Sequence, residues 1–310
     1  MPEKYQHLKC VQPLHQSTVK DYLNCPRMFY LKHIQGMKDE FRYPAMLHGT
    51  VLHKIIEIIH KSYWNFDVEH NYRHLMNETE YQGRDYQIPV KWEDRDKEIS
   101  DYTDNAHEII ANYRNKTYNQ NCTAILSEAP FRVKIGGIMY EGVIDQVRQL
   151  ESGEKVLVDF KSGKMKPDAV AVTNDIQFSI YLIALSEGEF NINGIWVRPR
   201  MFVDRCALYF LRGHEVYKRN GSYGKIGDEK DSEPLIWVSK SSQDIELFKQ
   251  ELSQIHKAMN QQLFYRNANG CRFCHHKEAC DSSMFDVSHD ELDRAQELID
   301  AFNPTLKEVA

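Results

Sequence analysis

The chain has 310 residues, of which 42% are hydrophobic and 27% are charged, and its formal net charge is −6 at pH 7. This composition is typical of a globular protein with an apolar core, and it excludes a low-complexity chain or a uniformly basic surface. The first residues carry charge, and 18 consecutive apolar residues occur nowhere, so we expect neither a secretory signal nor a membrane span. We therefore expect a cytoplasmic protein, whose seven cysteines are core residues or metal ligands rather than disulfides.

The first third of the chain is predicted to be helical. A helix is expected to open at Ser17 or Thr18 and to run into Cys25-Pro26, where the proline can end it or begin the next helix.

A second helix is predicted from Met46 to Tyr63, where apolar residues recur at helical spacing. It carries His53 and Glu57 four positions apart, hence on one face. Residues 64–104 are polar and weakly periodic, and we interpret them as a helical or irregular insertion.

From Ala124 the pattern is that of a sheet. Strands are predicted at residues 131–135, at 140–145 and, after a tight turn, at 155–161. By the period-two rule the last strand places one set of side chains on one face (Leu157, Asp159, Lys161) and another on the opposite face (Val156, Val158, Phe160).

The rest of the chain adds a helix at 175–185, further strands at 194–203, 207–211 and 235–238, and a helix at 244–263. A long loop is expected at 213–234, because that segment is rich in Gly, Lys, Asp and Ser. The sequence thus predicts an α/β protein in which helices flank a central mixed sheet. We divide it into an N-terminal helical region (1–123), a core of sheet and helix (124–240) and a C-terminal segment (241–310), all within one compact domain.

Polar residues recur in this pattern as candidates for a single site: His53, Glu128, Asp145, Asp159, Lys161, Gln177 and Tyr181. Carboxylates and an imidazole around one point suit a hard divalent cation such as Mg²⁺ or Mn²⁺. Such a cation lowers the pKa of a bound water, and a nearby lysine can orient that water and stabilise charge on phosphorus. These are the parts that phosphodiester hydrolysis requires.

The order of these residues resembles the PD-(D/E)xK nuclease superfamily, and in particular its RecB-type branch. The resemblance rests on Gly142-Val143-Ile144-Asp145, on Asp159-Phe160-Lys161, on the upstream His53 and on the downstream Gln177-x-x-x-Tyr181. It implies a restriction-endonuclease-like fold. It also implies that Asp145, Asp159, His53 and the Phe160 backbone carbonyl bind the cation, with Glu128 as a looser match. Lys161 would be the catalytic lysine, and Gln177 and Tyr181 would complete the catalytic set.

Cys271-x-x-Cys274-x5-Cys280 forms a second cluster, and Cys25 is the nearest candidate for a fourth thiolate. A lone C-x-x-C motif can be a redox pair or half of a zinc site, and His275 or His276 would complete a Cys₃His zinc site. One N-terminal and three C-terminal cysteines resemble the iron–sulfur nucleases of the same superfamily, namely the AddB-type subunits and the CRISPR-associated four-cysteine exonucleases. That resemblance implies a structural [4Fe–4S] cluster on the four cysteines.

The resulting hypothesis is a metal-dependent DNA exonuclease that acts on single strands or DNA ends. Basic residues interleaved with aromatics at 198–202 and 217–225 are suited to a single strand. No phosphate-binding G-x-x-x-x-G-K-[ST] motif occurs, so we expect no helicase motor in this chain. It would act as a stand-alone nuclease or as the nuclease subunit of a larger assembly, with a helicase-type or integrase-type protein as the candidate partner. The alternative is a non-catalytic nucleic-acid-binding subunit of a repair, recombination or spacer-acquisition complex.

Overall fold

The structure is a computed structural model that describes residues 13–61, 66–82, 87–163, 166–212, 215–217, 223–225 and 234–285. The chain divides into two compact units. Unit 1 comprises residues 1–19 and 40–262, and unit 2 comprises residues 20–39 and 263–310. Each unit is therefore built from segments that are distant in the sequence.

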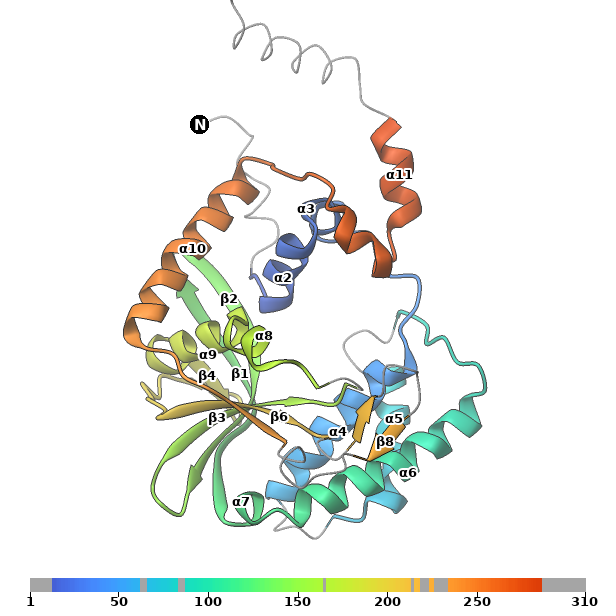
Figure 1. The fold of residues 1–310 in the computed structure, drawn as a ribbon, viewed down its shortest axis with the longest axis vertical. Helices are drawn as coiled ribbons and strands as arrows, with labels where there is room; N and C mark the ends of the chain where they lie inside the picture. Colours follow the sequence, from blue (N-terminus) through green and yellow to red (C-terminus); the bar gives the residue numbers. More distant parts are fainter. Residues whose placement is uncertain are drawn as a thin grey trace, which may run out of the picture. The chain divides into compact units, whose positions relative to one another are not determined.

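Unit 1 is organised around a seven-stranded sheet with the strand order β5-β4-β1-β2-β3-β6-β9 (Figure 1). β3 and β6 run parallel and the other neighbours are antiparallel, so the sheet is mixed. The strands are β1 (Cys122–Ile135), β2 (Ile138–Leu150), β3 (Lys155–Lys161), β4 (Glu189–Ile192), β5 (Ile195–Val197), β6 (Arg205–Phe210) and β9 (Leu235–Val238). A separate two-stranded sheet pairs β7 (Glu215–Tyr217) with β8 (Tyr223–Lys225).

Helices cover both faces of this sheet, and β3 shows how the sequence separates them. Val156, Val158 and Phe160 belong to one core cluster, whereas Leu157 belongs to another. The first cluster lies under α4 (Pro44–Lys61), α5 (Val68–Gln82) and α6 (Arg95–Arg114). The second lies under α9 (Ile176–Glu187) and α10 (Ser242–Asn260). The predicted fold class is thus confirmed, and so is the predicted alternation along β3.

Residues 64–104 are mostly helical where the structure describes them. α5 and the first half of α6 fall within this range, and Val68, Tyr72 and Met76 are buried in the core cluster beneath them. The helical period is masked because α5 also buries Glu80, whose carboxylate pairs with Arg95 at 2.7 Å. Of the two alternatives predicted for this segment, helical or irregular, the helical one is confirmed for these residues.

The strand predicted at 194–203 is shorter than expected. β5 ends at Val197, and two residues later Pro199 cannot donate a ladder hydrogen bond. Arg200 then adopts a left-handed backbone with φ of 47°, which does not continue a strand.

The segment 169–187 combines α8 (Ala169–Thr173) with α9 and has the length and apolar composition of a membrane span, with a mean hydropathy of 1.3. Half of it is buried inside the protein. Since α9 packs its apolar side chains into the core of unit 1, the segment is weak evidence for a span.

Unit 2 consists of short helical pieces around buried aromatic side chains. They include the end of α2 (Gln16–Asn24), α3 (Pro26–Phe29), a π-helix (Tyr30–Ile34), a 3₁₀-helix (Ala268–Phe273) and α11 (Lys277–Phe285). Phe29 stacks on Phe264 with ring centroids 6.0 Å apart, and the Tyr22 hydroxyl donates to the Leu263 carbonyl at 3.0 Å. These contacts join the N-terminal and C-terminal segments of the unit.

One buried histidine of unit 1 makes stability depend on pH. His256 on α10 is bonded to the Tyr140 hydroxyl at 2.5 Å, and burial lowers its pKa to about 4. The unfolded chain has the ordinary value of 6.5, so unfolding takes up a proton between these values. The contribution of His256 is therefore present above pH 6.5 and is lost as the pH falls through about 4.

We expect the free energy of unfolding to fall by about 3 kcal/mol on this account between pH 7 and pH 4. His256→Gln removes the titration, so its unfolding free energy should fall less over the same range, as measured by chemical denaturation. An identical pH dependence of the variant and the wild type would contradict this assignment.

Candidate active site

The two aspartates lie where the paired strands β2 and β3 end their ladder. Gln146 pairs with Val158, so Asp145 stands at the next position of β2. Its Oδ2 accepts a hydrogen bond from the Phe160 amide at 2.7 Å, which ties it to β3. Asp145 is 8% exposed and Asp159 is 1% exposed. Two buried carboxylates are thus held by adjacent strands.

Asp159 is surrounded by donors from β3 and α9. The Lys161 Nζ lies 2.8 Å from its Oδ2, and the Gln177 amide donates to its Oδ1. Lys161 also donates to Gln177 Oε1 at 3.4 Å, and Gln177 Nε2 donates to the Tyr181 hydroxyl at 3.0 Å. Since the Lys161 side chain is 40% exposed while Gln177 and Tyr181 are buried, the lysine faces the solvent side of this network.

On the other side of Asp145 lie His53 and Glu128. His53 Nδ1 is 3.6 Å from Asp145 Oδ2 and 3.4 Å from Glu128 Oε1. Potential ligand atoms of the three residues all lie within 4.8 Å of one another. They form the one such group of histidine, cysteine or acidic residues among the described parts of the chain.

The backbone of β1 positions Glu128 for this group. Ser127 pairs with Gln146 and Ala129 pairs with Ile144, so Glu128 faces Asp145 across the strands. Glu128 has a φ of 45°, a left-handed conformation that costs energy for a residue with a side chain. Strain of this kind at a candidate ligand favours a functional role for Glu128.

Glu57 does not join the group, although it shares a helix face with His53. Its carboxylate pairs with Lys54 at 3.0 Å and with Lys61 at 2.5 Å. The spacing of four residues therefore did not identify the partners of His53, which come from β1 and β2.

Charges in the site are strongly coupled. Burial raises the pKa of Asp159 to about 6, and the neighbouring Asp145 adds to the effect. Burial also raises the pKa of Asp145. For His53, burial lowers the pKa, but Asp145 and Glu128 outweigh it and bring the pKa to about 9. Burial likewise opposes the charge of Lys161, yet Asp159 raises its pKa.

The donor set fits a hard divalent cation. Glu128, Asp145 and Asp159 bring three carboxyl groups to the cluster, against the two basic groups of His53 and Lys161, so acidic groups outnumber basic ones. A histidine binds a cation in its neutral form, so binding at His53 would displace its proton. Carboxylate oxygens with one imidazole nitrogen are ligands that Mg²⁺ or Mn²⁺ accept. The Phe160 carbonyl remains a predicted ligand.

A groove opens onto this cluster from α4 and has a volume of about 510 Å³. His53 and Glu128 line it, together with Met46, Lys54 and Ser162. The helix approaches the end of β3 closely, because a Cβ at Gly49 would lie 2.7 Å from the Ser162 hydroxyl oxygen. A substrate can thus reach the candidate metal ligands from solvent.

Unit 2 gathers four cysteines, Cys25, Cys271, Cys274 and Cys280, around one small cavity. Gly270 lies against Cys25, since a Cβ at Gly270 would be 3.3 Å from the Cys25 Cβ. A side chain at position 270 would therefore crowd the cysteine.

The surroundings of the sulfurs are rich in donors and positive charge. The Asn267 amide donates to Cys25 Sγ at 3.4 Å, and Arg266 Nε donates to Cys271 Sγ at 3.4 Å. Burial raises the pKa of the Cys280 thiol, while Arg266 and Arg27 act in the opposite direction. Such donors stabilise thiolates, the form in which cysteine binds metal.

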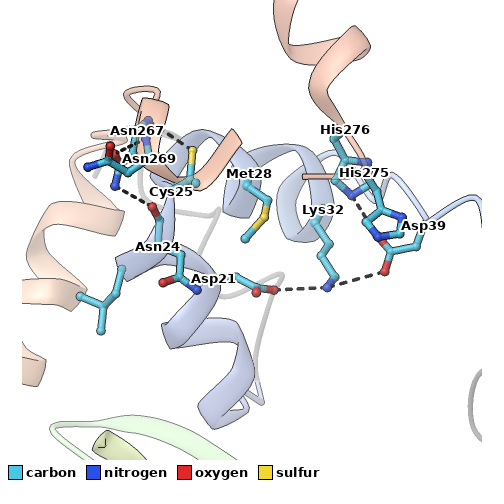
Figure 2. A pocket seen from close by; sticks show the side chains of 12 residues that line it. Asp21, Asn24, Cys25, Met28, Lys32, Asp39, Asn267, Asn269, His275 and His276 are labelled. Carbon is cyan, nitrogen blue, oxygen red and sulfur yellow. Dashed lines mark hydrogen bonds and ion pairs between the residues drawn. The ribbon is translucent and has the colours of Figure 1, made fainter. Parts of the chain in front are cut away.

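A second pocket of unit 2 is lined by Cys25 and by the two histidines, His275 and His276 (Figure 2). His276 faces Asp39, with Nε2 and Oδ1 3.3 Å apart, and Lys32 bridges Asp39 and Asp21 at 3.9 and 3.3 Å. Cys25 lies beside Asn267 instead (Figure 2). Neither His275 nor His276 lines the cavity that the four cysteines share.

Gln16 is a site residue that the sequence analysis missed. Its Nε2 donates to the Tyr181 hydroxyl at 3.3 Å, across 165 positions of the chain. It is the first residue of α2, just before the predicted helix start at Ser17 or Thr18, and it carries no periodic or motif signal, so only the fold reveals it.

Comparison with known proteins gives one family. The family model for the PD-(D/E)XK nuclease superfamily matches residues 13–281. Among solved structures, one described as a "Putative exonuclease" from Eubacterium rectale has 11% sequence identity and a TM-score of 0.44, covering 88% of this chain and 91% of that chain. Another, described as SSO0001, has 12% identity and a TM-score of 0.29, covering 86% and 95%. The curated proteins contain no match.

Proposed function

Because the chain belongs to the PD-(D/E)XK nuclease superfamily, we propose that it is a divalent-cation-dependent deoxyribonuclease, an exonuclease that acts on single strands or DNA ends. The observation that carries the proposal is the pair of buried carboxylates, Asp145 and Asp159, beside the half-exposed Lys161. Burying such charges without a function is costly.

Each residue has a role in this proposal. Asp145, Asp159 and His53 hold Mg²⁺ or Mn²⁺, with the Phe160 carbonyl and Glu128 as further ligands. When bound, the cation activates a water and clamps a phosphate oxygen. The Lys161 ammonium, anchored on Asp159 at 2.8 Å, orients that water and stabilises the charge that develops on the phosphate.

Gln177 and Tyr181 support the residues of this site rather than contact the DNA. They are 4% and 2% exposed, which leaves little surface for contact with a strand. Gln177 instead holds both Asp159 and Lys161, so it fixes the geometry between a metal ligand and the catalytic ammonium.

We also propose that Cys25, Cys271, Cys274 and Cys280 hold a structural [4Fe–4S] cluster. Four thiols around one cavity, with amide and guanidinium donors to the sulfurs, suit such a cluster. The orientation of His276 toward Asp39 disfavours the Cys₃His zinc alternative.

Cleavage is tested by digestion of 5′- and 3′-labelled single- and double-stranded DNA with Mn²⁺, Mg²⁺ or EDTA. We expect cation-dependent release of short products from the wild type. Lys161→Met should lower kcat by about 10³-fold, since it removes a transition-state contact.

Lys134→Met is the matched control, because Lys134 is an exposed lysine on β1. It should cleave as the wild type does. DNA binding by the wild type without turnover on any substrate or cation would instead support the non-catalytic subunit, whereas full activity of Lys161→Met would refute the assigned role of the lysine.

A further inference from the structure

The segment before α2 is anchored to the sheet next to the candidate active site. The Leu14 amide donates to the Met139 carbonyl, and the Glu141 amide donates to the Leu14 carbonyl, both at 2.9 Å. His15 Nδ1 is also 2.9 Å from the Glu141 carbonyl oxygen. Three contacts with β2 therefore fix the position from which the Gln16 side chain extends.

Gln16 stands at the end of a chain of hydrogen bonds that reaches Asp159 and Lys161. The Tyr181 hydroxyl accepts from Gln16 at 3.3 Å and from Gln177 at 3.0 Å. A hydroxyl has two acceptor sites, so these two amides fix its orientation. Gln177 in turn contacts Asp159 and Lys161.

We propose that Gln16 is a positioning residue of the nuclease site. By holding the Tyr181 hydroxyl it fixes the Gln177 amide, and that amide sets Asp159 and Lys161 in their relative places. This inference rests on the proposed function, and it adds a residue from the N-terminal segment that touches neither the candidate cation ligands nor the groove.

Stability alone does not account for a glutamine at this position. The Gln16 Oε1 is buried and has no hydrogen-bond partner among the residues that the structure describes. A buried acceptor without a partner costs free energy that an apolar side chain of similar size would avoid. Replacing Gln16 by leucine should therefore leave the fold as stable or make it more stable.

The test uses the full chain with Gln16→Leu, and with Gln16→Met as a second variant that keeps the unbranched side chain. Three quantities are measured: kcat and KM of DNA cleavage with Mn²⁺, the Mn²⁺ dissociation constant by calorimetry, and the unfolding midpoint in EDTA. We expect kcat and Mn²⁺ affinity to fall about tenfold each, as for other supports of metal ligands. KM should be unchanged, and the unfolding midpoint should be no lower.

Gln35→Leu is the matched control, because Gln35 also donates its amide to a tyrosine hydroxyl, that of Tyr30, at 3.2 Å in unit 2. It should match the wild type in kcat and Mn²⁺ affinity.

Wild-type kcat and Mn²⁺ affinity in both Gln16 variants would overturn the inference, and so would losses explained wholly by a lower unfolding midpoint. If the wild type cleaves no DNA, the proposed function fails, but the calorimetric comparison still decides whether Gln16 positions the site.

Discussion

Asp159→Asn is expected to abolish DNA cleavage and to stabilise the protein when no divalent cation is bound. Asp159 is 1% exposed, and burial together with Asp145 raises its pKa to about 6, against 3.8 in the unfolded chain. The folded state therefore binds the proton more tightly, and the stabilising contribution of Asp159 is complete below about pH 4. It is lost as the pH rises through about 6, which costs about 3 kcal/mol at pH 8.

Asparagine lacks this titration and keeps an oxygen for the Gln177 amide. In EDTA at pH 8 its unfolding free energy should exceed that of the wild type by about 1–3 kcal/mol. Added Mn²⁺ should stabilise the wild type by mass action but not the variant. Chemical denaturation with and without Mn²⁺ measures both differences.

Asp101→Asn serves as the control for charge alone, because Asp101 is exposed on α6. It should retain cleavage and the response to Mn²⁺. An Asp159→Asn protein that is less stable than the wild type in EDTA would contradict the destabilising effect assigned to the buried carboxylate, and one that still cleaves DNA would contradict its assigned role as a cation ligand.

Cys280→Ser is expected to prevent binding of the proposed iron–sulfur cluster and to unfold unit 2. Cys280 is 7% exposed and lines the cavity shared with the other three cysteines. Serine is a poor ligand for iron, so the purified variant should be colourless and contain no iron or sulfide, whereas the wild type should be brown. The loss should be visible by metal analysis and by faster proteolysis in residues 263–285.

Cys206→Ala is the control, because Cys206 is also buried, at 2% exposed, but lies in unit 1, where burial raises its pKa to about 12. It should keep the colour and the full iron content. A wild-type protein that is colourless and carries one zinc ion would refute the cluster.

The sequence predicted the parts of the site that lie on regular elements. The strand 155–161 was placed at the bounds that the structure has, because its mostly apolar run directly follows a tight turn. The superfamily followed from short motifs around Asp145, Asp159 and Lys161, and the family match confirms it.

What the sequence did not reveal depends on contacts between distant elements. β1 starts at Cys122, well before the predicted 131. The prediction missed residues 122–130 because they lack a regular alternation of polar and apolar residues and end in Pro130. The orientation of Glu128 arises from a left-handed backbone angle, and the partner of Tyr181 comes from a helix 165 residues away. Neither leaves a periodic signal in the sequence.

The division of unit 2 between two ends of the chain also has a consequence for synthesis. Residues 20–39 are synthesised before their partners, which begin at residue 263, so 223 residues must be made in between. At about 5–20 residues per second this takes roughly 10–45 s. Throughout that time Phe29 and Leu31, which are buried in the folded protein, lack the C-terminal segment of unit 2. Cys25 likewise lacks the other three cysteines of the shared cavity. Unit 2 therefore cannot assemble until the segment that begins at residue 263 has been synthesised.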